Sequence, residues 1–230
     1  MPSLTRCLFI GVVLSCAACV RAGFSGGIAA SDTGSSSDDT RSDDTRSDDT
    51  RSDDTGLSAP FPGVYYSVGY FTGDLKAGAP TITIAGGLAT LSLAQPARIG
   101  LGDIITYGAA GRAFITGRRS ATRYYVSNAH GNPLPDLSAA LVVSIRRAFH
   151  SLSTAHRDSA TTSFLGTVDL ANNDLQLNWV LYDDAPLVDS RIVIDSWITS
   201  STGFLRIFTP VAATEVGVSQ RHSGRAGTGV

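Results

Sequence analysis

Short apolar or alternating runs, separated by glycines, are the feature that most restricts how this chain can fold. Between Pro60 and Val143 these runs are VYYSVGY, TITIA, LATLSLA, DIITYG, RAFITG and TRYYVSNA. Runs of this length with alternating apolar residues are typical of half-buried β-strands. The pair Gly86–Gly87, between TITIA and LATLSLA, predicts a hairpin turn. We therefore expect residues 59–143 to form a small all-β module, either an antiparallel sheet or a barrel.

A different pattern begins at Ile145 and predicts a helix over IRRAFHSLSTA, residues 145–155. The helical spacing puts Phe149 on an apolar face and Arg147 on the opposite, polar face. Three strand candidates follow, LQLNWVLY, RIVIDSWI and FLRIF. A helix followed by a stack of short strands predicts a helix-capped start of a β-solenoid over residues 144–222. The expected fold class is therefore mainly β.

The N-terminal residues 1–22 have the features of an export signal. Arg6 supplies a positive charge, and the apolar core Cys7–Ala18 is too short to span a membrane comfortably. Two processing routes fit, because a small residue precedes Gly23 and because LSC and AAC are imperfect lipoprotein boxes. The sequence leaves open whether the protein is simply secreted or is lipidated at Cys19 or Cys16.

Metal and cofactor sites are not indicated by the sequence. The cysteines all lie in the export signal, so the rest of the chain forms no disulfide and no cysteine-based metal site. The histidines lack zinc-ligand spacing; they are His130, His150, His156 and His222. We therefore expect no cofactor and no bound metal.

Residues 23–58 form a polar tract that contains SDDT four times, three of them as RSDDT. The repeat has no apolar residue, so ordering it would cost conformational entropy without any burial. We expect a disordered linker. Its aspartates could attract divalent cations, but the repeat lacks the glycine that a calcium loop requires.

The charge of the chain is unevenly distributed. Ser31–Gly56 holds nine aspartates and three arginines, whereas the residues outside this tract and the export signal hold 11 acids and 13 bases. The body of the protein is close to neutral, so the sequence gives no electrostatic reason to expect nucleic-acid binding.

Adjacent tyrosines are the only ligand-binding candidates in the first β module. Tyr65–Tyr66 and Tyr124–Tyr125 each place two rings on opposite faces of a strand, so we expect one ring of each pair to be exposed. Such a ring could stack on a saccharide, although aromatic residues are also favoured for packing within strands.

Catalytic residues are not predicted. The acidic residues that could act in a β-helix polysaccharide lyase are also typical of exposed turns; they are Asp183, Asp184, Asp189 and Asp195. The segment Gly100–Asp103 partly matches a phosphate loop, but it lacks a third glycine and a following helix, which favours a turn.

Three blocks, GLGDIITYG, RAFHSLSTA and TPVAATEVGVSQRHSG, resemble the N-terminal module of large bacterial surface or secreted proteins of unknown function. In that family the module often precedes a right-handed parallel β-helix. The resemblance extends from Tyr65 to Gly227 and supplies no catalytic residues. Relatives commonly continue beyond the last block, whereas this chain stops at Val230.

These observations predict an exported surface or extracellular protein with a non-catalytic structural, adhesive or binding role. The alternative is a carbohydrate-binding or polysaccharide-lyase-like β-helix protein, or a remnant of one. The expected partners are a polysaccharide or another surface protein, and the expected membrane contact is a lipid anchor. Residues 223–230 read as a flexible tail, and the whole segment after Phe208 is too small to cover an open solenoid end. Self-association through that end is therefore a further expectation.

Overall fold

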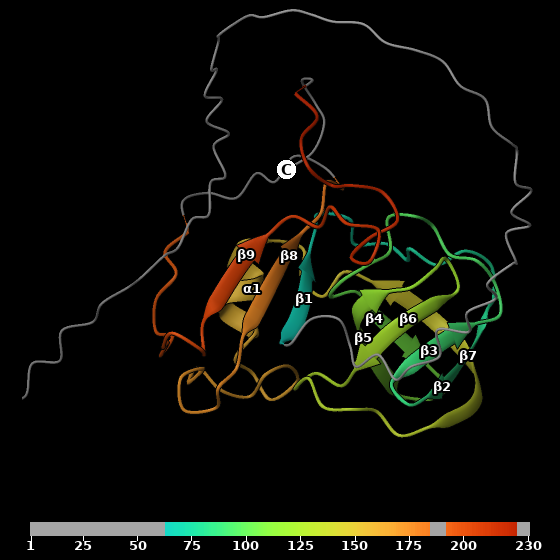
Figure 1. Cartoon of the computed structure of the whole chain (residues 1–230), viewed down its shortest axis with the longest axis horizontal. Helices are drawn as coiled ribbons and strands as arrows, with labels where there is room; N and C mark the ends of the chain where they lie inside the picture. The colour runs from blue at the N-terminus through green and yellow to red at the C-terminus, as the bar shows by residue number, and fades with distance from the viewer. Residues whose placement is uncertain (1–62, 185–191, 225–230) are drawn as a thin grey trace, which may run out of the picture. The chain divides into compact units, whose positions relative to one another are not determined.

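Six antiparallel strands close into a barrel in the order β2-β3-β6-β5-β4-β7 (Figure 1). The computed structural model describes residues 63–184 and 192–224, so the expected export signal, with Cys16 and Cys19, and the RSDDT tract lie outside the described residues. The strands are β2 (Thr81–Ala85), β3 (Leu88–Leu91), β4 (Ile104–Tyr107), β5 (Gly111–Arg118), β6 (Arg123–Ser127) and β7 (Leu137–Arg146). The barrel confirms the mainly β class and the antiparallel pairing expected from the short runs TITIA to TRYYVSNA, but the run VYYSVGY lies outside it, in a parallel sheet.

Strands β2 and β3 show how local sequence forms the barrel. In TITIA the isoleucines Ile82 and Ile84 are buried and the other three residues are exposed, as strand alternation requires. Gly86 and Gly87 have φ angles of 55° and 78°, which suit a tight hairpin turn, and Ala85 pairs with Leu88. The predicted hairpin is confirmed.

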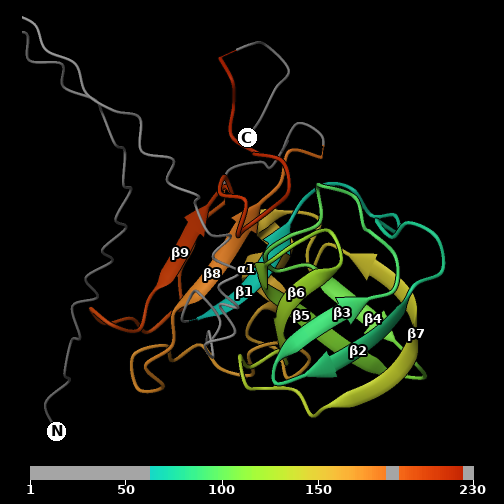
Figure 2. The same ribbon diagram turned by 45° about the vertical axis from the view of Figure 1, so that its right-hand side comes forward.

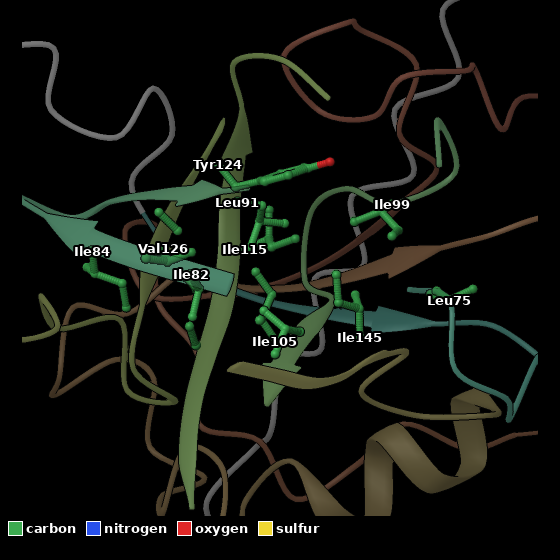
Figure 3. Packing of buried hydrophobic residues seen from close by; sticks show 13 residues of the cluster. Leu75, Ile82, Ile84, Leu91, Ile99, Ile105, Ile115, Tyr124, Val126 and Ile145 are labelled. Atoms are coloured by element: carbon green, nitrogen blue, oxygen red, sulfur yellow. The ribbon is translucent and has the colours of Figure 1, made fainter. Parts of the chain in front are cut away.

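Side chains fill the barrel interior (Figure 3). The cluster combines inward residues from all six strands with residues of the flanking loops. Its labelled members are Leu75, Ile82, Ile84, Leu91, Ile99, Ile105, Ile115, Tyr124, Val126 and Ile145. The barrel is therefore a packed core, as is usual for a barrel of this small size.

The remaining strands form a parallel sheet in the order β1-β8-β9 (Figure 2). These are β1 (Val64–Val68), β8 (Leu177–Leu181) and β9 (Leu205–Phe208). Tyr66 pairs with Trp179, and Trp179 pairs with Ile207, so corresponding residues stack across the sheet.

Both faces of β1 are buried, as is typical of parallel sheets. Tyr66 on one face meets Phe114 of the barrel strand β5 with ring centroids 5.6 Å apart. Tyr65 on the other face belongs to a second apolar cluster with Val216. That cluster exists because the chain after β9 returns to the barrel, where Val216 bridges Gly100.

The expected helix over residues 145–155 is wrong in its position. Ile145 belongs to β7 and pairs with Ile105 of β4, and the helix α1 spans Leu152–Asp158. Ser151 caps α1 by accepting a hydrogen bond from the Thr154 backbone N–H. Pairing with β4 outweighs the helical spacing of residues 145–149, because β7 must pair with β4 to close the barrel. The expected boundary between residues 143 and 144 consequently falls within β7.

Candidate functional site

The tyrosines proposed as ligand contacts are mostly buried. Tyr65, Tyr66 and Tyr124 lie in apolar clusters, and only Tyr125 is partly exposed. Burial raises the pKa of Tyr65 to about 12 and also raises that of Tyr66. The expectation that one ring of the Tyr65–Tyr66 pair faces solvent is therefore corrected: β1 is covered on both faces, which a single-strand pattern does not reveal.

The candidate aspartates do not form one site. Asp184 has a buried side chain, Asp183 and Asp195 are exposed, and Asp189 lies outside the described residues. Nowhere in residues 63–184 and 192–224 do three or more His, Cys, Asp or Glu side chains gather in a way that could hold a metal ion. The same part of the chain contains no helix long and apolar enough to cross a membrane.

A buried ion cluster joins the barrel to the parallel sheet. Arg147, directly after β7, donates from Nη1 to both carboxylate oxygens of Asp103 at 2.8 Å. It also donates from Nε and Nη2 to the two oxygens of Asp184 at 2.7 and 2.9 Å. Its guanidinium carbon lies 3.5 Å from the ring centroid of Tyr182. The expected position of Arg147 on a polar helix face is therefore wrong.

Burial determines the ionisation of this ion cluster. Desolvation raises the pKa of Asp103, and this effect exceeds the opposing effects of the Arg147 charge and of the Gly100 backbone N–H. The two carboxylates in turn raise the pKa of Arg147 in spite of its burial. The sequence signal for this ion cluster was Asp103, an acidic residue inside the apolar block GLGDII. The sequence did not indicate the cluster itself, because Arg147 and Asp184 are distant from Asp103 in the chain.

A groove of about 300 Å³ is lined in part by Arg147. It is bounded by the segment after β1, the chain between β7 and α1, the helix α1 and the loop that follows it. Its lining residues are Phe71, Thr72, Arg146, Arg147, Ala148, Phe149, His150, Thr154, Arg157, Asp158 and Phe164. We call this feature the arginine groove.

Positive charge predominates around the arginine groove. Asp158 is its one acidic lining residue, and Arg157 holds that carboxylate with two hydrogen bonds of 2.7 Å. The Arg157 guanidinium lowers the pKa of Asp158, so the acid stays ionised and this pair is neutral. Arg146 is exposed and donates to the Thr72 carbonyl at 3.3 Å, and no carboxylate pairs with it in the described part of the chain.

Aromatic rings form much of the arginine groove. The ring centroids of Phe149 and Phe164 lie 4.6 Å apart, and each ring also meets Tyr66. The guanidinium of Arg98 lies 4.7 Å from the Phe71 ring centroid, and that of Arg112 lies 5.3 Å from the Phe164 ring centroid. Two further arginines therefore lie over aromatic rings that line the groove. The sequence did not indicate the arginine groove, because its residues come from four separate segments of the chain.

The outer side of β9 is a second unusual surface. Within the described ranges β9 pairs only with β8, so its other edge has no strand partner there. Ile207 of β9 is exposed, as are Val193 and Ile198 in the chain that precedes this strand. Unpaired strand edges flanked by apolar side chains are surfaces on which further strands assemble.

No family model matches this chain, and no curated protein or solved structure gives a significant match to it. The resemblance to bacterial surface and secreted proteins remains a prediction from the sequence blocks. The arginine groove and the ladder β1-β8-β9 are therefore the observations from which a function can be inferred.

Proposed function

We propose that this chain is an exported surface or extracellular protein with a non-catalytic structural and binding role, built on the first coils of a β-solenoid. The observation that carries this proposal is the parallel ladder β1-β8-β9, in which equivalent residues stack in register. Stacked coils of a solenoid pair in this manner, each with its neighbour.

Two isolated parallel bridges support the solenoid. Val68 bridges Phe149, and Asp169 bridges Ile198, so parallel contacts also occur outside the ladder. The lengths of chain from Asp169 to Ile198 and from Leu177 to Leu205 are similar, as expected for one coil. A parallel connection of this kind is right-handed in nearly all proteins, which fits a right-handed β-helix.

The barrel, rather than α1, has the position of an end cap in this proposal. At the edge of β1 away from β8, the Ser67 N–H donates to the carbonyl of Gly102, just before β4, at 3.1 Å, whereas β9 has an unpaired edge in the described chain. An apolar solenoid end requires such a cover. The β9 edge is then where further coils, a second copy or another surface protein would add.

Export is supported by residues 1–22, with lipidation at Cys19 or Cys16 as one of two routes. Cell fractionation of the full chain tests this part. We expect the protein outside the cytoplasm, with Cys19→Ala or Cys16→Ala releasing it from membranes if it is lipidated. Retention of the wild-type chain in the cytoplasm would contradict the proposed role.

The binding role is tested with a panel of extracellular polymers, measuring retention and cleavage in parallel. We expect retention without chain cleavage. The second candidate, a polysaccharide-lyase-like activity, is favoured by the presence of Arg146, His150 and Asp158 in one groove. Release of unsaturated sugar products by the wild-type chain, and not by His150→Ala, would establish the second candidate instead.

A further inference from the structure

We propose that the arginine groove is a binding site for an acidic saccharide, a uronate, whose carboxylate is held by Arg146. This inference rests on the binding role proposed above and assigns it to one place on the molecule.

The charge balance favours an anion. No carboxylate of the described residues pairs with Arg146, whereas the charges of Arg157 and Asp158 neutralise each other. The buried ion cluster below the groove contributes at most one net negative charge, because Arg147 offsets one of its two acids. Arg98 and Arg112, which lie over the Phe71 and Phe164 rings, more than balance that charge. The summed field therefore attracts a negatively charged ligand.

Arg146 is suited to a carboxylate in particular. A guanidinium offers five N–H donors in a planar fork that matches a carboxylate with two parallel hydrogen bonds. The described residues use one of those donors, in the 3.3 Å bond from Nη1 to the Thr72 carbonyl. The remaining donors of this exposed side chain are available to a ligand.

The size and lining of the groove fit one or two sugar rings. Its volume of about 300 Å³ is at the lower end of the range for small-molecule sites. Phe71 and Phe164 offer apolar surface, while Thr72 and His150 add polar groups beside it. Apolar and polar lining side by side suits a sugar, which has an apolar ring face and a hydroxyl rim.

An acidic peptide fits the groove less well, because the backbone groups beside the groove already make hydrogen bonds within the protein. The Phe149 N–H donates to the Ser67 carbonyl at 2.9 Å, and the Phe149 carbonyl accepts from the Gly69 N–H at 3.0 Å. The Ala148 N–H donates to the Ser67 hydroxyl at 2.9 Å, and the Ile145 N–H donates to Asp74. A peptide could therefore not add as a strand along this wall.

The test measures binding of a galacturonic acid trimer to the full chain by calorimetry. A neutral galactose trimer, inorganic phosphate and a glutamate tripeptide serve as competing probes. We expect the acidic trimer to bind, and Arg146→Gln to weaken it roughly tenfold to a hundredfold, the usual effect of losing a charge-assisted contact. Arg146→Lys should restore part of the affinity, because it keeps the charge without the fork.

The matched control is Arg123→Gln, which removes one exposed arginine from β6 on the barrel. It should leave binding unchanged, and both glutamine variants should keep the wild-type melting temperature. Equal binding of the neutral trimer, the phosphate or the tripeptide would overturn the inference, as would equal loss in the two glutamine variants.

Failure of this inference and failure of the proposed function are distinguishable. If the chain is exported and retained by a polymer, but the acidic trimer does not bind or binds independently of Arg146, the inference is overturned and the binding role stands. If the trimer binds through Arg146 but the chain stays in the cytoplasm, the groove assignment stands and the proposed extracellular role falls.

Discussion

Nη1 of Arg147 lies 2.8 Å from both carboxylate oxygens of Asp103, and both side chains are almost completely buried. Asp103 precedes the barrel strand β4, and Arg147 follows β7. The same guanidinium binds Asp184, which follows the sheet strand β8. One arginine therefore ties the barrel to the parallel sheet.

Replacing Arg147 by methionine should destabilise the protein by about 3–5 kcal/mol, because two buried carboxylates would lose their cation. The sequence-based expectation was instead that Arg147 lies on the polar face of a helix. Urea unfolding measures the effect. Arg146→Met, one residue away and exposed, is the control and should change the free energy of unfolding by no more than about 0.5 kcal/mol. Equal effects of the two substitutions would contradict the structural role of Arg147.

Asp103 should give the protein a pH-dependent stability of unusual sign. Burial raises its pKa in the folded state, so its contribution is fully present below the unfolded value of about 3.9 and is lost as the pH rises through the folded value. Relative to Asp103→Asn, the wild type should lose stability as the pH rises above about 4. Unfolding at a series of pH values measures how the free energy of unfolding of each protein changes with pH. The same pH dependence in the wild type and in Asp103→Asn would exclude this contribution.

Gly102→Ala should be far more damaging than Gly86→Ala. Both glycines have positive φ angles, 79° and 55°, so alanine is strained at either position. A Cβ at Gly102 would also collide with the backbone of Tyr66 and Ser67, whereas a Cβ at Gly86 meets nothing within 4 Å. We expect Gly86→Ala to lower the free energy of unfolding by about 1 kcal/mol and Gly102→Ala to lower it by clearly more. Similar melting temperatures for the two variants would show that β1 does not pack against Gly102.

Phe149→Ala should cost about 3–5 kcal/mol, as truncation of a buried phenylalanine usually does. Its ring is buried against Tyr66 and Phe164, between the barrel and the sheet. Leu141→Ala is the control, because Leu141 on β7 is exposed, and its effect should be small. A loss below about 1 kcal/mol at Phe149 would mean that this aromatic cluster contributes little to stability.

Much of the barrel could be predicted because its signals are local. The alternation in TITIA determines which residues face inward, and Gly86–Gly87 determines where the hairpin turns. Both follow from the period of a strand and from the φ angles that glycine permits. Phe149 is buried as expected, but the expectation came from a helical stripe over residues 145–155, whereas Phe149 precedes α1.

The arginine groove could not be predicted, because no local pattern joins its residues. Phe71 follows β1, Arg146 ends β7, Asp158 ends α1 and Phe164 lies in the next loop. The tyrosine candidates failed for a related reason. Tyr65 and Tyr66 do point to opposite faces, but the barrel covers one face and the returning C-terminal segment covers the other.

The sequence by itself determined the β class and the barrel hairpin, since alternation and turn glycines act over a few neighbouring residues. Only the tertiary structure decided that residues 145–146 extend a strand, that Arg147 is buried and that Arg146 stands free at a groove. The physical reason is that strand pairing and ion pairing are made between segments far apart in the chain. Barrel closure and the burial of Asp103 and Asp184 then outweighed the helical spacing around Arg147.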